Sequence, residues 1–100
     1  MTVDEARHKL EEFRVVIDDV DRRIVELINE RTRIVENIGR VKREAQLPVY
    51  EPKREDMVFA NITGCNRGPI TNEAVRRIFE RIIDEMRTIQ RVHMQSDGAK

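Results

Sequence analysis

Three basic side chains lie on or beside a run of apolar residues in the first half of the chain. Arg31 takes a position where the apolar repeat expects a leucine, Lys42 follows eleven residues later, and Arg14 borders the same repeat. On a helix, Arg31 and Lys42 lie about 20° apart around the axis and about 16 Å apart along it. Cations in an apolar seam need anionic partners. The spacing therefore indicates that long side chains bind one small anion.

A structural role is the alternative for these residues. Arg31 can pair with a glutamate in a helix interface, while Arg14 and Lys42 can extend over apolar surface with their charged ends in water. Other polar residues favour a ligand site, because Gln90 continues the apolar stripe of the last helical segment. Because several polar residues lie on inner faces together, we interpret them as a binding site.

No pattern for covalent or metal chemistry is found. The chain offers no Ser-His-Asp set and no His/Cys cluster of metal spacing, and Gly64 and Gly68 lack the Lys-Ser or Lys-Thr of a phosphate loop. Cys65 is the single cysteine and is predicted to be a loop or packing thiol. His8 and His93 are predicted to lie on the surface. We therefore expect no cofactor and no metal.

Composition argues against charged macromolecular partners. Nineteen Lys and Arg balance nineteen Asp and Glu, so no overall field attracts nucleic acid or an anionic membrane. The first residues are polar and charged, and no run approaches the roughly 18 apolar residues of a membrane span. We expect no signal peptide, no membrane span and a cytoplasmic location.

The element that must position the cations is a long helix. Apart from the position that Arg31 takes, apolar residues recur every three or four positions from Leu10 to Val41, which predicts one amphipathic helix from Val3 to about Ala45. A helix of about 40 residues is about 60 Å long, whereas a compact 100-residue globule has a radius of gyration of about 13 Å. The rest of the chain is too short to cover this helix, so we expect a second copy to do so.

Two shorter helices are predicted to follow. Prolines interrupt the pattern, and the second helix is expected over Pro52 to Ile62, with Glu51 as a possible N-terminal cap. After a glycine-containing break, Thr71 is expected to cap a third helix that ends near Val92.

The predicted fold class is all-α, with one very long and two shorter helices in an intertwined homodimer. Residues 1–93 form the helical domain and residues 94–100 a disordered tail. Arg14 and Arg31 lie about 25 Å apart along their helix, too far to share one small ligand. If two long helices cross antiparallel near Ile24, Arg14 of the partner subunit approaches Arg31, and each dimer has two composite sites.

Five sequence motifs in this order resemble the all-helical chorismate mutases, including forms fused to other enzymes of aromatic amino acid biosynthesis. The motifs are Leu10 to Arg14 with Ile17 to Asp21, then Leu27 to Arg31, Val41-Lys42, Pro48 to Glu55, and Ile82 to Gln90.

The resemblance implies the rearrangement of chorismate to prephenate, a unimolecular Claisen reaction that requires no cofactor. It implies that Arg31 and Arg14 of the partner subunit bind the two carboxylates, supported by Arg54. Lys42 and Gln90 donate to the ether oxygen, which gains negative charge as its bond to carbon breaks. The resemblance therefore implies that Arg31, Lys42 and Gln90 are the catalytic residues.

The resemblance also implies that Glu55 accepts a hydrogen bond from the ring hydroxyl, and that the Glu51 region does likewise. Glu51 and Met86 depart from the family's common residues. For Glu51, a helix cap and a ligand contact remain open; for Met86, the pocket wall and the core remain open.

Two other functions stay open at this level. An isochorismate-pyruvate lyase uses the same fold with a similar cationic pocket, and a non-catalytic helical dimer is a regulatory or interaction module. Feedback regulation and a partner enzyme of the same pathway are also undecided by the sequence.

Overall fold

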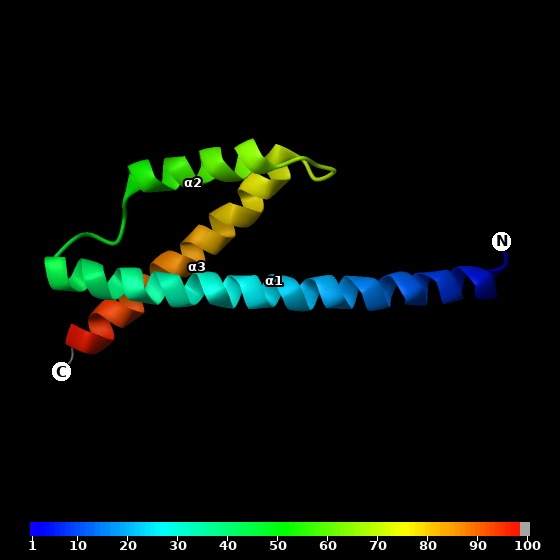
Figure 1. Ribbon diagram of the computed structural model, residues 1–100, viewed down its shortest axis with the longest axis horizontal. Coiled ribbons are helices and arrows are strands. Elements are labelled where there is room, and N and C mark those ends of the chain that lie inside the picture. Colours follow the sequence, from blue (N-terminus) through cyan, green and yellow to red (C-terminus); the bar gives the residue numbers. More distant parts are fainter. Residues whose placement is uncertain (99–100) are drawn as a thin grey trace. The chain divides into compact units, whose positions relative to one another are not determined.

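The computed structural model describes residues 1–98, with side chains through Met94. These residues form three α-helices: α1 spans Val3–Ala45, α2 spans Pro52–Cys65 and α3 spans Asn72–Gly98 (Figure 1). The predicted all-α class, with one very long and two shorter helices, is confirmed. The chain divides into two compact units, Met1–Arg33 and Ile34–Lys100.

The C-terminal end of α1 is closed by main-chain hydrogen bonds. Gln46 has a left-handed φ of 57°, and its amide donates to the Arg43 carbonyl at 3.2 Å. The Leu47 amide donates to the Lys42 carbonyl at 2.7 Å. This pair of bonds is a Schellman motif, which satisfies carbonyls that have no partner within the helix. The predicted end at Ala45 is confirmed.

Helix α2 begins as predicted and ends later. Pro52 suits the first turn because its fixed φ is helical and its missing amide hydrogen is not needed there. The helix continues to Cys65 rather than ending near Ile62. A glycine costs a helix only about 1 kcal/mol, so the one at position 64 does not stop it. It ends at Asn66, whose backbone is extended.

Helix α3 has the predicted cap and a longer body. The Thr71 hydroxyl accepts a hydrogen bond from the Ala74 amide at 3.1 Å, which satisfies one of the free donors of the first turn. The helix runs to Gly98 rather than ending near Val92, because no proline or glycine interrupts it earlier. The expected tail, residues 94–100, stays a prediction, and positions 99 and 100 lie outside the described residues.

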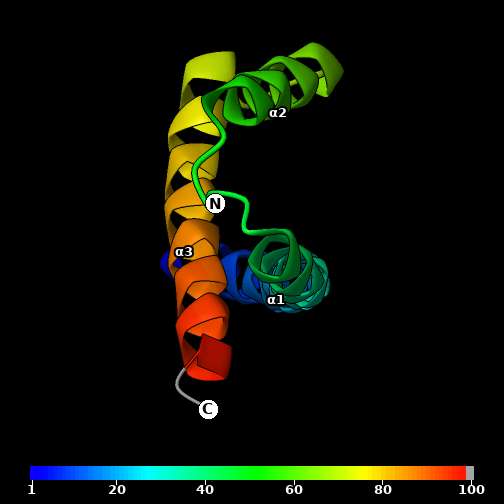
Figure 2. The ribbon, with the colours of Figure 1, turned by 90° about the vertical axis from the view of Figure 1, so that its left-hand side faces the viewer.

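The packed part of the structure is the unit that begins at Ile34. There α3 crosses the last turns of α1, and a short connection joins it to α2 (Figures 1 and 2). Among the side chains that the structure describes, the buried apolar ones are Val35, Ile83 and Met86, from these two helices. Lys42 and Gln90 are buried among them, with 7% and 9% of their surface exposed. This small apolar core therefore encloses two polar side chains that can form hydrogen bonds.

The two helices approach closely at a glycine of α1. Gly39 is buried, and a Cβ at its position would lie 3.5 Å from the Gln90 Cα. About one turn earlier on α1 and one turn later on α3, His93 Nε2 lies 2.6 Å from Glu36 Oε2. These contacts fix the position of Gln90 along the axis of α1.

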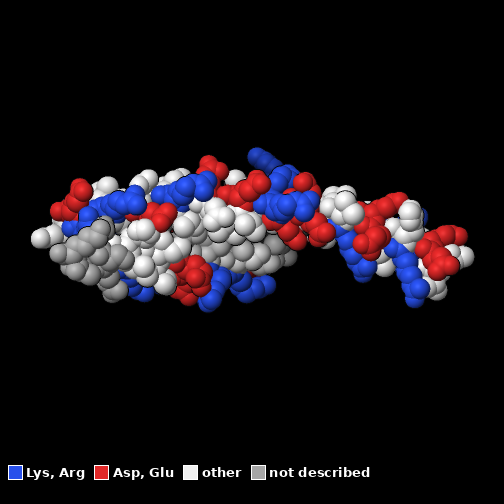
Figure 3. All heavy atoms as spheres, turned by 90° about the horizontal axis from the view of Figure 1, so that it is seen from below, with Lys and Arg blue, Asp and Glu red and all other residues white. Residues whose placement is uncertain are grey.

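The unit of residues 1–33 is the N-terminal part of α1. Its apolar stripe is exposed, including Leu10 at 48%, Phe13 at 68%, Ile17 at 58%, Ile24 at 47% and Leu27 at 63%. Basic and acidic side chains are mixed along the face of the molecule in Figure 3. None of the helices described is both long and apolar enough to cross a membrane.

Candidate active site

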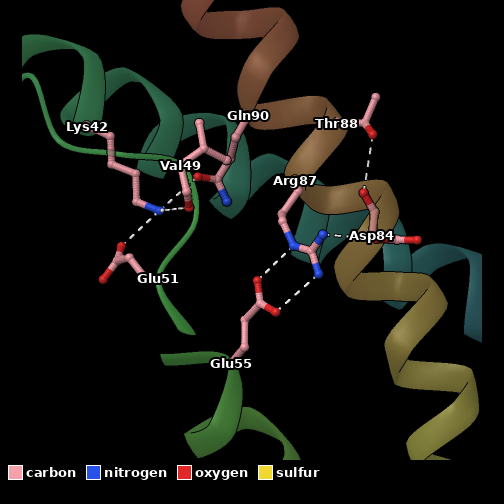
Figure 4. Close-up of polar contacts among 8 residues, drawn as sticks. All are labelled: Lys42, Val49, Glu51, Glu55, Asp84, Arg87, Thr88 and Gln90. Carbon is pink, nitrogen blue, oxygen red and sulfur yellow. Dashed lines mark hydrogen bonds and ion pairs between the residues drawn. The ribbon is translucent and has the colours of Figure 1, made fainter. Parts of the chain in front are cut away.

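Lys42 is the centre of a polar cluster inside the second unit. Its ammonium group donates to the Gln90 side-chain oxygen Oε1 at 3.0 Å and to the Val49 carbonyl at 2.9 Å. It also lies 2.9 Å from the Glu51 carboxylate oxygen Oε1 (Figure 4). An ammonium group has three donors, so each one has an acceptor from a different part of the chain.

The local sequence explains why these three acceptors converge. Lys42 lies in the last turn of α1, and the left-handed Gln46 turns the chain immediately afterwards. The segment that follows contains Pro48 and forms no helix before Pro52, so the Val49 carbonyl has no helical partner and accepts from Lys42. Helix α3 supplies Gln90 from the other side (Figure 4).

The contact with Lys42 orients the Gln90 amide. Because Oε1 accepts from the ammonium, the NH2 group of the same amide is the part that can donate to a ligand. A buried amide held by a charged donor does not rotate freely. Lys42 and Gln90 therefore form a pair of donors with fixed geometry. Their contact is consistent with the shared role that the resemblance implies for them.

The side chain of Glu51 pairs with Lys42 and does not cap α2. It occupies the N-cap position of α2, but its side chain makes no capping hydrogen bond. The hydrogen bond from Lys42, together with the positive charges of Lys42 and Arg54, lowers the pKa of Glu51 below its ordinary value of 4.5. Half of its side chain is exposed, so this carboxylate can also reach solvent or a ligand. The predicted N-cap position of Glu51 is therefore confirmed, its side chain pairs with Lys42 instead of capping the helix, and a ligand contact stays a prediction.

Glu55 lies beside this cluster and is bound by a residue that the sequence had not indicated. Arg87 donates through Nε to Glu55 Oε2 at 2.8 Å and through an NH2 group to Oε1 at 3.1 Å (Figure 4). The hydrogen bond to Glu55 raises the pKa of Arg87 above its ordinary value. Arg87 lies three positions before Gln90, hence on a neighbouring part of the same helix surface. That spacing is the signal in the sequence that could have pointed to Arg87.

The other expected site residues have different surroundings. Arg54 is exposed on the first turn of α2, and its charge acts on Glu51. Met86 is 4% exposed and belongs to the small core; whether it also lines a pocket stays a prediction. In the unit of residues 1–33, Arg31 is half-buried, and Arg14 is exposed and lies 3.6 Å from Glu11.

The second unit thus combines two kinds of group for a polar ligand. Gln90 supplies an amide NH2 group that can donate to a ligand oxygen, and Lys42 supplies an ammonium that can donate to it once the ligand displaces one of its acceptors. Glu55 supplies a carboxylate that can accept. All three side chains are at least largely shielded from water, which strengthens their electrostatic effect. This arrangement suits a reaction that needs stabilisation of a developing negative charge rather than a nucleophile.

Comparison with known families identifies the group to which such a site belongs. The model of the family described as chorismate mutase type II matches residues 13–91, which is most of the chain. The chain belongs to this family. The match covers both donors, Glu55 and Arg87, so every contact of the cluster in Figure 4 lies inside the type II chorismate mutase region.

Three relatives illustrate this membership. The chain is 40% identical over 80 residues to a bifunctional chorismate mutase/prephenate dehydratase of Pseudomonas aeruginosa, covering 75% of this chain but 22% of that protein. It is 26% identical to a chorismate mutase of Methanocaldococcus jannaschii, covering 92% and 94% of the two chains. The solved chorismate mutase (form II) of Thermus thermophilus is similar with a TM-score of 0.81 and 36% identity, covering 83% and 94%. The chain thus spans about a fifth of the bifunctional relative and nearly all of the other two.

Proposed function

We propose that this chain is a chorismate mutase, an isomerase that converts chorismate into prephenate in aromatic amino acid biosynthesis. Membership of the type II family supports the reaction. The observation that carries the proposal is the donor pair of Lys42 and Gln90, which is buried and joined at 3.0 Å. The rearrangement moves negative charge onto the ether oxygen of the substrate, and two fixed donors at that oxygen stabilise the transition state more than the ground state.

The remaining roles follow from the family resemblance. Arg31 and Arg14 of the partner subunit bind the two carboxylates of chorismate, and Arg54 supports that end of the pocket. Glu55 accepts a hydrogen bond from the ring hydroxyl. Held at these points, the substrate stays in the folded conformer in which the reacting carbons are close together. The protein contributes position and electrostatics, and no covalent intermediate forms.

A second copy of the chain completes the site in this proposal. The exposed apolar stripe of residues 1–33 favours it, because a contiguous apolar surface along a helix usually marks an interface. The small core formed by Val35, Ile83 and Met86 is a further reason, since a chain of this size needs additional buried surface. The cytoplasmic location and a partner enzyme of the same pathway stay predictions.

The test of activity is a direct assay of the purified chain with two substrates. We expect chorismate to disappear and prephenate to form, measured by chromatography. Pyruvate from isochorismate without prephenate from chorismate would identify the lyase instead. A folded helical protein that consumes neither substrate would favour the non-catalytic dimer.

The test of the shared site mixes two inactive variants. Arg14→Ala and Arg31→Ala remove different arginines, so a mixed dimer keeps one site with both arginines intact. After mixing and refolding, we expect activity to return to about a quarter of the wild-type value, because half of the dimers are mixed and each has one of two sites. If mixing restores nothing while both variants still form dimers, the subunit-swapped arrangement is wrong.

A further inference from the structure

A two-point ion pair ties α2 to α3 beside the proposed donor pair. Arg87 and Glu55 are separated by 32 positions in sequence and meet through two hydrogen bonds of 2.8 and 3.1 Å. Their side chains are 27% and 19% exposed. Two parallel hydrogen bonds from one planar guanidinium define the orientation of a carboxylate as well as its position.

Arg87 is itself held from two other sides. A third nitrogen donates to the Asp84 carboxylate at 3.1 Å, and the guanidinium carbon lies 5.6 Å from the centre of the Tyr50 ring. The latter distance lies within the range of a cation–π contact. Tyr50 belongs to the segment that also carries Val49 and Glu51, the acceptors of Lys42. The guanidinium therefore links the segment before α2, α2 itself and α3.

The pairing leaves Glu55 able to accept from a ligand. An ionised carboxylate has about four lone-pair positions on its two oxygens, and Arg87 uses one on each oxygen. A free glutamate on a helix samples several rotamers, and fixing one of them when a ligand binds would cost side-chain entropy. The ion pair removes most of that freedom before a ligand arrives.

We propose that Arg87 is a positioning residue for the substrate, which fixes the Glu55 carboxylate as the acceptor for the ring hydroxyl. This inference rests on the proposed function. The hydroxyl contact exists in the bound substrate and in the transition state alike, so it supplies uniform binding. Arg87 consequently acts on KM, whereas Lys42 and Gln90 act on kcat.

The experiment compares Arg87→Met with Arg81→Met in the full chain with chorismate. Arg81 is the matched control, because it lies on the same helix and pairs with Glu85 at 2.8 Å but is 75% exposed. We expect Arg81→Met to match the wild type. We expect Arg87→Met to lose about 10- to 100-fold in kcat/KM, with KM rising at least about 10-fold and kcat changing less than about 3-fold.

Two further variants separate positioning from general loosening of the fold. In a Glu55→Gln background, Arg87→Met should cause little additional loss, since both act through one contact. Arg87→Lys keeps the charge without the two-point geometry and should recover part of the affinity. If Arg87→Met does not fold, the KM and kcat of Arg87→Lys decide by the same criterion.

The outcomes distinguish the two proposals. A wild-type chain that consumes no chorismate overturns the proposed function and this inference with it. An active wild type with an Arg87→Met variant equal to Arg81→Met overturns the inference alone. The inference is also overturned if Arg87→Met lowers kcat rather than raising KM. It is overturned as well if the fold-losses in kcat/KM of Arg87→Met and Glu55→Gln multiply fully in the double variant.

Discussion

Replacing Gln90 with glutamate changes one NH2 group into an oxygen and leaves the volume of the side chain almost unchanged. The wild-type amide oxygen already lies 3.0 Å from the Lys42 ammonium, so the new carboxylate has a cation in place and the fold should survive. The lost function is specific, because an ionised carboxylate cannot donate to the ether oxygen. Loss of one fixed donor typically lowers kcat about 100- to 1000-fold.

The structure places the expected loss at the upper end of that range. A carboxylate at position 90 competes for Lys42 more strongly than an amide does, so it weakens the second donor as well. We therefore expect Gln90→Glu to lose about 1000-fold in kcat at neutral pH, equal to about 4 kcal/mol. Activity should return as the pH falls, because a protonated carboxyl group donates again.

The assay is the rate of chorismate loss across pH for Gln90→Glu and the wild type. Asn61→Asp, which adds the same charge on an exposed face of α2, is the control for a general charge effect. Circular dichroism at each pH checks that the variant is folded. Near wild-type activity of Gln90→Glu at neutral and mildly alkaline pH would refute Gln90 as a donor to the substrate.

Three other changes test the cluster and its support. Lys42→Met leaves the Val49 carbonyl and the Gln90 oxygen without their donor, so unfolding in urea should show a loss of about 2–4 kcal/mol of stability, together with loss of activity; an unchanged midpoint would contradict the network. Glu51→Gln should lower Tm at neutral pH and leave it unchanged at a pH well below 4.5. The lowered pKa of Glu51 means that its contribution to stability is complete above 4.5 and is lost as the pH falls through the folded-state pKa. An equal difference in Tm between variant and wild type at both pH values would argue against the ion pair. Gly39→Ala should keep or slightly raise Tm, since its Cβ meets ordinary contacts and alanine favours helix by up to about 1 kcal/mol, while Gly39→Leu should lower Tm by forcing α3 away.

Periodicity and turn chemistry were enough to predict the helices but not all their ends. The start of α2 at Pro52 and the cap at Thr71 depend on local rules, and both are confirmed. The predicted end of α2 is too early because the neighbouring helical residues override a lone glycine. The predicted end of α3 is too early because no proline or glycine interrupts it before Gly98. The end of α1 at Ala45 was correct, since a proline-containing segment follows directly.

The candidate site could be predicted only in part. Lys42 and Gln90 were grouped by resemblance, and the structure brings them into direct contact. The Val49 carbonyl could not be found, because a main-chain acceptor leaves no mark in the residue type. Arg87 was missed because its partner is 32 positions away, and nothing in a single sequence pairs one glutamate with one arginine among many.

The three acceptors around Lys42 mean that this ammonium has no spare donor for an incoming molecule. If Lys42 donates to the substrate oxygen, that oxygen must displace one of these acceptors. The Glu51 carboxylate is the one most easily displaced, because it is half-exposed and can form hydrogen bonds with water in place of Lys42. A neutral ether is a weak competitor for a lysine that already has a carboxylate partner. The same oxygen becomes a strong competitor once negative charge develops on it. Competition from Glu51 therefore makes Lys42 bind the transition state more tightly than the ground state of the substrate.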